Sequence, residues 1–97
     1  MNNLYLVSQS KNNDYDTYDS FVVVAESPHK AALISPDDSY PHWDSEVGKW
    51  YSVSDIGVFR YQYNGGTWTS PENVEVWQIG TTQEELGKVL ISSFNEG

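Results

Sequence analysis

The chain has 97 residues, which is enough for one small domain, and we expect a single domain over residues 1–97. Its 14 acidic residues against 5 basic ones give a formal net charge of −9, which disfavours direct binding to nucleic acid or to an anionic membrane. The chain has no cysteine, which excludes disulfides, thiolate metal sites and a cysteine nucleophile.

The first third of the chain predicts two strands and a helix. Residues 4–7 are an apolar run typical of a strand, and residues 8–20 are polar, which indicates a long loop or hairpin connection. The continuous apolar run at 21–25 predicts a central strand covered on both faces. The Ser-Pro pair at 27–28 is a helix-start signal, so we expect a short helix over residues 28–35.

The middle of the chain predicts a loop followed by two strands and a tight turn. Residues 37–46 are rich in Asp, Ser and Pro and are expected to form a loop. Residues 50–53 and 58–63 have the composition of strands. The Asn-Gly-Gly stretch within residues 63–68 indicates a tight hairpin, because Asn and Gly tolerate the positive φ angles of primed turns.

The last part of the chain predicts a strand, a second helix and a final strand. Residues 74–79 alternate as a strand does, and two overlapping capping boxes at 81–85 indicate a helical turn that Gly87 ends. Residues 89–94 complete the chain as a strand. The predicted fold is a single small α+β domain, with a mainly antiparallel sheet of about 5–6 strands and two short helices.

The acidic residues are concentrated in one part of the chain. Residues 14–46 hold eight acids against Lys30 alone, a local formal charge of −7, with aromatic side chains between them. Aspartates accept hydrogen bonds from arginine and lysine, and tyrosine adds rigid contact area, which is typical of hot spots at protein interfaces. We therefore predict a partner-binding face composed of Asp14, Tyr15, Asp16, Tyr18, Asp19, Asp37, Asp38, Tyr40, Trp43, Asp44 and Glu46.

Other interpretations fit the same loops. Residues 12–19 place oxygen ligands at alternating positions, as a cation site needs, but Thr17 and Val23 stand where the EF-hand pattern requires glycine and glutamate. Tyrosines among aspartates would also suit a sugar ring. A small ligand-, sugar- or cation-binding domain is therefore the alternative function, and a solvated surface with Asx turns is the non-functional one.

Catalysis is not expected from the residue content. His42 lies near Asp37, Asp38 and Asp44 in the sequence, but no zinc-binding histidine spacing, nucleophile elbow or phosphate-binding glycine loop is present. A deep pocket pairing His42 or His29 with a carboxylate would indicate an enzyme. We predict a non-enzymatic protein without a cofactor or metal. With no secretory signal pattern and no apolar run of about 20 residues, the cytoplasm is the expected location.

Several segments resemble a group of small, uncharacterised bacterial and bacteriophage proteins. The resemblance is found at YLVSQ (5–9), NNDYDTYDS (12–20), VVVAES (22–27), Pro36, PENVEVWQIG (71–80) and LISSFNEG (90–97). Its specific parts are NDYDTYDS and SSFN-x-G. The resemblance covers about half of the chain and brings no catalytic residues. It implies a phage or prophage setting. By size, charge and setting the chain looks like anti-CRISPR and other phage anti-defence proteins.

The resemblance and the charge pattern together predict an inhibitor. Such a protein would dock its acidic Tyr/Asp face on the basic, nucleic-acid-binding surface of a host protein complex in the host cytoplasm. Because duplex DNA carries one charge per ~1.7 Å, 14 acids would match at most about 24 Å of duplex. The expected mimicry of DNA is therefore partial.

Overall fold

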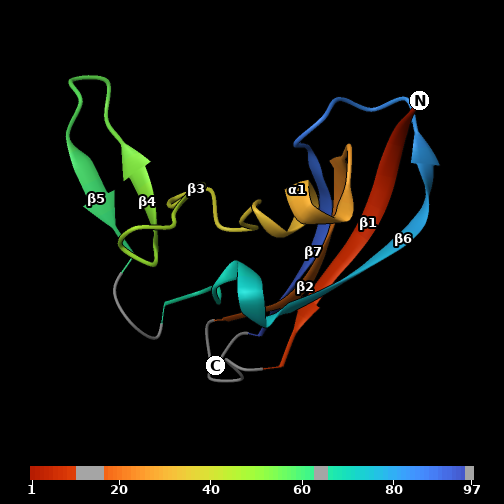
Figure 1. Ribbon diagram of the computed structural model, residues 1–97, viewed down its shortest axis with the longest axis horizontal. Helices are drawn as coiled ribbons and strands as arrows, with labels where there is room; N and C mark the ends of the chain where they lie inside the picture. Colours follow the sequence, from red (N-terminus) through yellow and green to blue (C-terminus); the bar gives the residue numbers. More distant parts are fainter. Residues whose placement is uncertain (11–16, 63–65, 96–97) are drawn as a thin grey trace.

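The computed structural model describes residues 1–10, 17–62 and 66–95, which form two antiparallel sheets. The large sheet has the strand order β6-β1-β2-β7, and the small sheet has the order β3-β4-β5. Figure 1 shows the two sheets at opposite ends of the molecule, with helix α1 between them. The strands are β1 (Asn2–Gln9), β2 (Thr17–Ala25), β3 (His42–Asp44), β4 (Lys49–Val53), β5 (Phe59–Tyr61), β6 (Val74–Thr82) and β7 (Val89–Asn95).

The predicted α+β fold with two short helices is wrong. Within the described ranges the structure has seven strands in two sheets, one α-helix, α1 (Pro28–Ala32), and one 3-10 helix, η1 (Pro71–Asn73). Helix α1 starts as predicted, because the Ser27 hydroxyl oxygen accepts a hydrogen bond from the Lys30 N–H at 3.2 Å. It ends three residues before the predicted boundary at residue 35.

The second predicted helix, over residues 81–85, is replaced by the end of a strand. Thr81 and Thr82 belong to β6 and pair with Asn3 and Asn2 of β1. The Thr82 hydroxyl oxygen accepts a hydrogen bond from the Glu84 N–H at 3.2 Å, two residues on, in place of the three-residue spacing that the predicted capping boxes require. Pairing with β1 gives hydrogen-bond partners to more backbone N–H and C=O groups than a single helical turn would. This explains why residues 81–82 extend the strand and do not start a helix.

Two of the predicted loops contain strand residues. In the stretch 8–20, β1 continues through Gln9 and β2 begins at Thr17, so the two strands form an antiparallel pair whose connection lies outside the described residues. The predicted loop at 37–46 contains β3, which pairs with β4. Strand β5 covers only residues 59–61 of the predicted strand 58–63.

One core joins the two sheets. Strand β2 lies inside the large sheet, between β1 and β7, and its Phe21, Val23 and Ala25 are buried on one face. On the other face Val24 is also buried, but Val22 is only half-buried. The predicted cover on both faces is therefore incomplete. The buried cluster consists of Tyr5, Val7, Phe21, Val23, Ala25, Ala31, Trp50 and Trp68.

Tryptophan side chains attach the small sheet to this core. Trp50 of β4 is 1% exposed, and its indole N–H donates to the carbonyl oxygen of Thr69 at 2.8 Å. Its ring packs edge-on against Trp43 of β3 with a centroid distance of 5.2 Å. Trp68 packs in the same manner on Phe21 of the large sheet, also at 5.2 Å. These contacts fix one face of the small sheet toward the core.

Candidate functional site

The outer face of the small sheet carries a row of aromatic side chains. The strand register places His42 of β3 opposite Tyr51 of β4, and Tyr51 opposite Tyr61 of β5. Side chains alternate between the two faces of a strand, so this row lies on the side opposite to Trp43 and Trp50. The same alternation places Phe59 next to Tyr61 on the outer face. We call His42, Tyr51, Phe59 and Tyr61 the aromatic face.

The four rings of the aromatic face form one connected cluster. Tyr51 lies at the centre and stacks on Phe59 with a centroid distance of 5.2 Å and an interplanar angle of 8°. It also contacts His42 at 5.4 Å and Tyr61 at 5.6 Å, and Phe59 is 6.4 Å from Tyr61. Such pairs lie within the range of favourable aromatic contacts, so the rings support one another without being buried.

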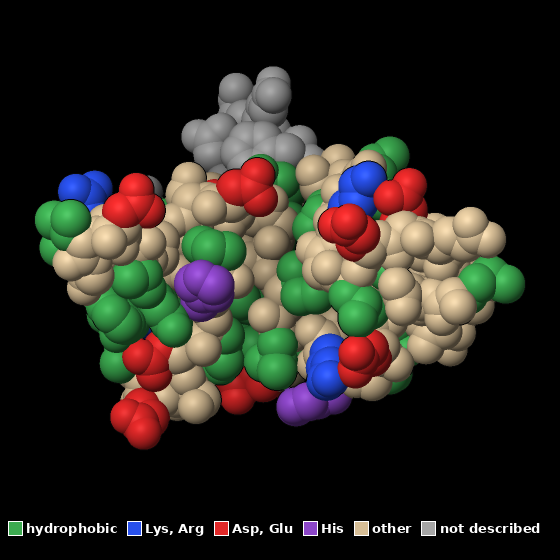
Figure 2. All heavy atoms as spheres, turned by 90° about the horizontal axis from the view of Figure 1, so that it is seen from above, with side chains coloured by type: hydrophobic (Ala, Val, Ile, Leu, Met, Phe, Trp, Pro, Cys, Tyr) green, Lys and Arg blue, Asp and Glu red, His purple; other side chains and the backbone are tan. Residues whose placement is uncertain are grey.

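This face is open to solvent although it is largely apolar. Phe59 is 53% exposed and Tyr61 is 37% exposed. Beside them, Val53, Ile56 and Val58 are also exposed on β4 and the connection to β5. Figure 2 shows hydrophobic side chains gathered beside a histidine at the left of the view, with acidic side chains around them. Contiguous apolar surface rimmed by polar residues is typical of interaction sites.

Asp44 holds a carboxylate at the edge of the aromatic face. Its Oδ1 accepts hydrogen bonds from the N–H groups of Glu46 at 3.0 Å and Val47 at 3.1 Å, and its Oδ2 accepts one from the Tyr61 hydroxyl at 3.0 Å. The bond from the Val47 N–H, followed by those from Tyr61 and the Glu46 N–H, lowers the pKa of Asp44. The same carboxylate raises the pKa of Tyr61. The carboxylate is therefore ionised and fixed in position at neutral pH.

The predicted partner-binding residues fall into three groups. Asp14, Tyr15 and Asp16 lie outside the described residues. In the second group, Tyr18 and Asp19 belong to β2 of the large sheet, and Asp37, Asp38 and Tyr40 lie in the loop between α1 and β3. The third group, Trp43, Asp44 and Glu46, belongs to β3 and the turn after it.

Within the second group, the charges of two aspartates act on Tyr18. Partial burial, and then the charges of Asp37 and Asp38, raise the pKa of Tyr18. Asp37 also organises its own loop, because its carboxylate accepts hydrogen bonds from the Ser39 N–H at 2.9 Å and from the Thr67 hydroxyl. Tyr40 is half-buried and packs against the core. Much of this group therefore serves the fold.

Three residues of the aromatic face were missed as site residues by the sequence analysis. Tyr51, Phe59 and Tyr61 were assigned to strands only, and His42 was considered only as an acid/base or metal group. The sequence pattern that could have found them is the alternation of side chains in residues 50–53 and 59–61. This alternation places Tyr51 on the face of the strand opposite to Trp50. The face becomes visible only when the strands are paired in register.

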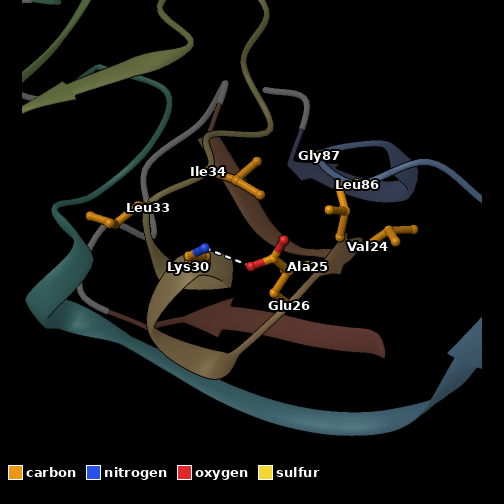
Figure 3. A pocket seen from close by; sticks show the side chains of 8 residues that line it. All are labelled: Val24, Ala25, Glu26, Lys30, Leu33, Ile34, Leu86 and Gly87. Carbon is orange, nitrogen blue, oxygen red and sulfur yellow. Dashed lines mark hydrogen bonds and ion pairs between the residues drawn. The ribbon is translucent and has the colours of Figure 1, made fainter. Parts of the chain in front are cut away.

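A separate hollow lies between α1 and the connection from β6 to β7 (Figure 3). Its volume is about 370 Å³, and apolar side chains including Leu33, Ile34 and Leu86 line it. The Lys30 ammonium and the Glu26 carboxylate form an ion pair of 2.6 Å at this hollow. Because these two charges satisfy each other, the hollow offers mainly apolar contact.

Catalysis or metal binding would need a histidine paired with a carboxylate in a pocket, or a cluster of ligating side chains. His29 and Glu72 line one hollow together with Trp43. They do not form an ion pair there, since the ion pairs among the described residues are Lys30–Glu26 and Lys88–Glu84. Among the described residues, no three His, Asp or Glu side chains are grouped closely enough to hold a metal ion. In the same part of the chain, no helix is long and apolar enough to cross a membrane.

Comparison of the chain with protein-family models, with curated proteins and with solved structures gave no match in any of the three cases.

Proposed function

We propose that this chain is a non-enzymatic binding protein whose aromatic face docks on a basic surface of a partner protein. The observation that carries this proposal is the cluster of four touching rings, half-exposed at Phe59, with the fixed carboxylate of Asp44 at its edge. Exposed aromatic side chains on a rigid support lose little conformational freedom on binding, so they are effective interface anchors.

Charge favours a basic partner. The chain carries a net charge of −9, and acidic side chains lie in the turns at both ends of β4, with Glu46 before it and Asp55 after it. Lys49, opposite Asp44 in the strand register, adds one basic group to this face. A field of this sign accelerates association with basic surfaces. An arginine of the partner would find an aromatic ring and a carboxylate together at Tyr61 and Asp44, which suits cation–π contact and charge-assisted hydrogen bonding.

The phage-type inhibitor that the resemblance implies would use this face against a nucleic-acid-binding protein. The site then differs in part from the predicted acidic face, because Tyr51, Phe59 and Tyr61 replace the tyrosines of the first loop as contact residues. Asp44 and Glu46 belong both to the acidic face predicted from the sequence and to the surroundings of the aromatic face. The identity of the partner and the anti-CRISPR role stay predictions.

Sugar binding is the alternative that the aromatic face also suits. A sugar ring stacks on the open face of an aromatic ring, and several such rings on one sheet would form a platform. Here Tyr51 and Phe59 stack on each other with an interplanar angle of 8°, so each covers part of the other. This mutual coverage favours contact with protein side chains over stacking with a sugar.

A titration with a short arginine-rich peptide, followed by NMR, tests the proposal. We expect shifts at Tyr51, Phe59 and Tyr61, weaker binding in Phe59→Ser, and unchanged binding in the control Leu33→Ser. Leu33 is exposed and lies outside the aromatic face, in a hollow beside the inward-facing Trp43. Binding should weaken as salt is raised. Shifts confined to other parts of the chain would contradict the proposal, and shifts at the same rings with neutral oligosaccharides alone would favour sugar binding.

A further inference from the structure

The outward face of the large sheet has an apolar row that crosses all four strands. The strand registers place Leu6 of β1 opposite Trp77 of β6 on one side and opposite Val22 of β2 on the other, and Val22 opposite Ile91 of β7. Tyr5, Val7, Phe21 and Val23 alternate with these residues and are buried in the core. The row Trp77, Leu6, Val22 and Ile91 therefore points away from the core.

The two ends of this row differ in shape. At the β6 end, Trp77 is 50% exposed and offers a large indole for contact. At the β7 end lies a shallow hollow of about 250 Å³, whose walls include Leu6, Val22 and Ile91. A large projecting ring and an apolar hollow thus occupy opposite ends of one line of side chains.

We infer that this face binds a second copy of the same chain in a two-fold symmetric dimer. The two-fold axis would lie in the plane between the two facing sheets, parallel to the strands and midway between β1 and β2. Rotation about this axis reverses the order of the four strands, so Trp77 of each copy lies over the hollow beside Ile91 of the other. In such an interface every contact occurs twice, and the assembly closes at two copies. A tryptophan seated in an apolar pocket is typical of the strongest contacts in protein interfaces.

The charges on this face support the same orientation. The row next to the apolar one consists of Glu75, Ser8, Ser20 and Ser93 in register across the sheet. The two-fold axis places Glu75 of one copy over Ser93 of the other, so the two glutamates are about 14 Å apart, the width of three strand spacings. The face thus allows two copies with a net charge of −9 each to meet with little local repulsion.

The size of the face sets the expected strength of the dimer. With a spacing of about 4.8 Å between strands and a rise of about 3.3 Å per residue, four strands of seven residues cover about 19 by 23 Å. This is smaller than the ~800 Å² that each partner buries in a standard interface, so we expect a dimer that dissociates in the micromolar range. Salt screens the repulsion between two acidic copies, so the dimer should become tighter at higher salt, opposite to binding of a basic partner at the aromatic face.

Sedimentation measurements over a range of protein concentrations test this inference. We expect the wild-type chain to form dimers, and Trp77→Ala and Ile91→Glu each to raise the dissociation constant about tenfold or more. Ile91 is 67% exposed, so the charge does not enter the core. The control Ile56→Glu adds the same charge at an 87% exposed position near the small sheet and should leave the dimer unchanged.

A mixture of two variants tests the reciprocal arrangement. Trp77→Ala keeps an intact hollow and Ile91→Glu keeps an intact Trp77, so their mixed dimer retains one of the two contacts and should form more readily than either variant alone. Far-UV circular dichroism establishes that both variants are folded. A wild-type chain that remains monomeric at about 1 mM, far above the micromolar range, overturns the inference, and so does a dimer that both variants leave intact.

Discussion

The hydroxyl of Tyr61 donates a hydrogen bond to Oδ2 of Asp44 at 3.0 Å, which links the last strand of the small sheet to the end of its first strand. The other oxygen of the same carboxylate accepts two backbone hydrogen bonds within that turn. One carboxylate thus closes the β3–β4 turn and positions a ring of the aromatic face.

The stability contributed by Asp44 should depend on pH. Because the folded state lowers the pKa of this group, its contribution is present above the ordinary carboxyl pKa and is lost as the pH falls through the lowered value. We expect Asp44→Asn to have a lower Tm than the wild type at pH 7, and we expect this difference to shrink in thermal melts at progressively lower pH.

Tyr61→Phe serves as the matched control for Asp44, since it removes one of the three hydrogen bonds and keeps the charge. Its Tm should lie between those of the wild type and Asp44→Asn at pH 7. A difference between wild type and Asp44→Asn that stays constant from pH 7 to acid would contradict the assigned role of the carboxylate.

Replacement of Trp50 should separate packing from hydrogen bonding in the core. Trp50→Ala removes a buried indole and should lower the free energy of unfolding by about 3–5 kcal/mol, a large part of the 5–15 kcal/mol typical of a small domain. Trp50→Phe keeps much of the ring volume but leaves the Thr69 carbonyl without the indole donor. Urea unfolding should place it between the wild type and Trp50→Ala, and a Phe variant as unstable as the Ala variant would refute this order.

The parts of the fold that the sequence predicted correctly depend on local patterns. The apolar runs at 4–7, 21–25 and 89–94 all lie in strands of the large sheet, and Ser27 starts α1 as its residue type indicates. These segments carry their signal in neighbouring residues, so pairing elsewhere in the chain was not needed to find them.

The errors occur where distant parts of the chain decide the local structure. Strand β3 has only three residues within a polar stretch, and it is a strand because β4 pairs with it. Residues 81–85 match a capping box, yet pairing with the first residues of β1 keeps Thr81 and Thr82 extended. The aromatic face has the same origin, since His42, Tyr51 and Tyr61 meet only through the register of three strands.

Two phenylalanines should differ sharply in their effect on stability. Phe21 is 1% exposed and contacts Trp68, so Phe21→Ala should reduce the free energy of unfolding by about 3–5 kcal/mol. Phe59 is 53% exposed, and Phe59→Ala should cost about 1 kcal/mol through its contact with Tyr51. Urea unfolding of the two variants measures both values. Equal losses would mean that the aromatic face is part of the core.

Two glycines should respond oppositely to an added methyl group because their backbone angles differ. Gly48, in the turn between β3 and β4, has a φ of 76°, and nothing lies within 4 Å of the Cβ that alanine would add. The cost of Gly48→Ala is therefore conformational and should be about 1–2 kcal/mol. Gly80 of β6 has no positive φ, and its added Cβ would meet Leu4 Cδ1 at 3.9 Å, an ordinary contact.

Gly80→Ala should thus leave the free energy of unfolding nearly unchanged or raise it slightly, since alanine restricts the unfolded chain more than glycine does. Chemical denaturation of both variants beside the wild type measures the two effects under one condition. A neutral Gly48→Ala would mean that the β3–β4 turn relaxes to another conformation, which would also displace Asp44 from Tyr61 and weaken the aromatic face.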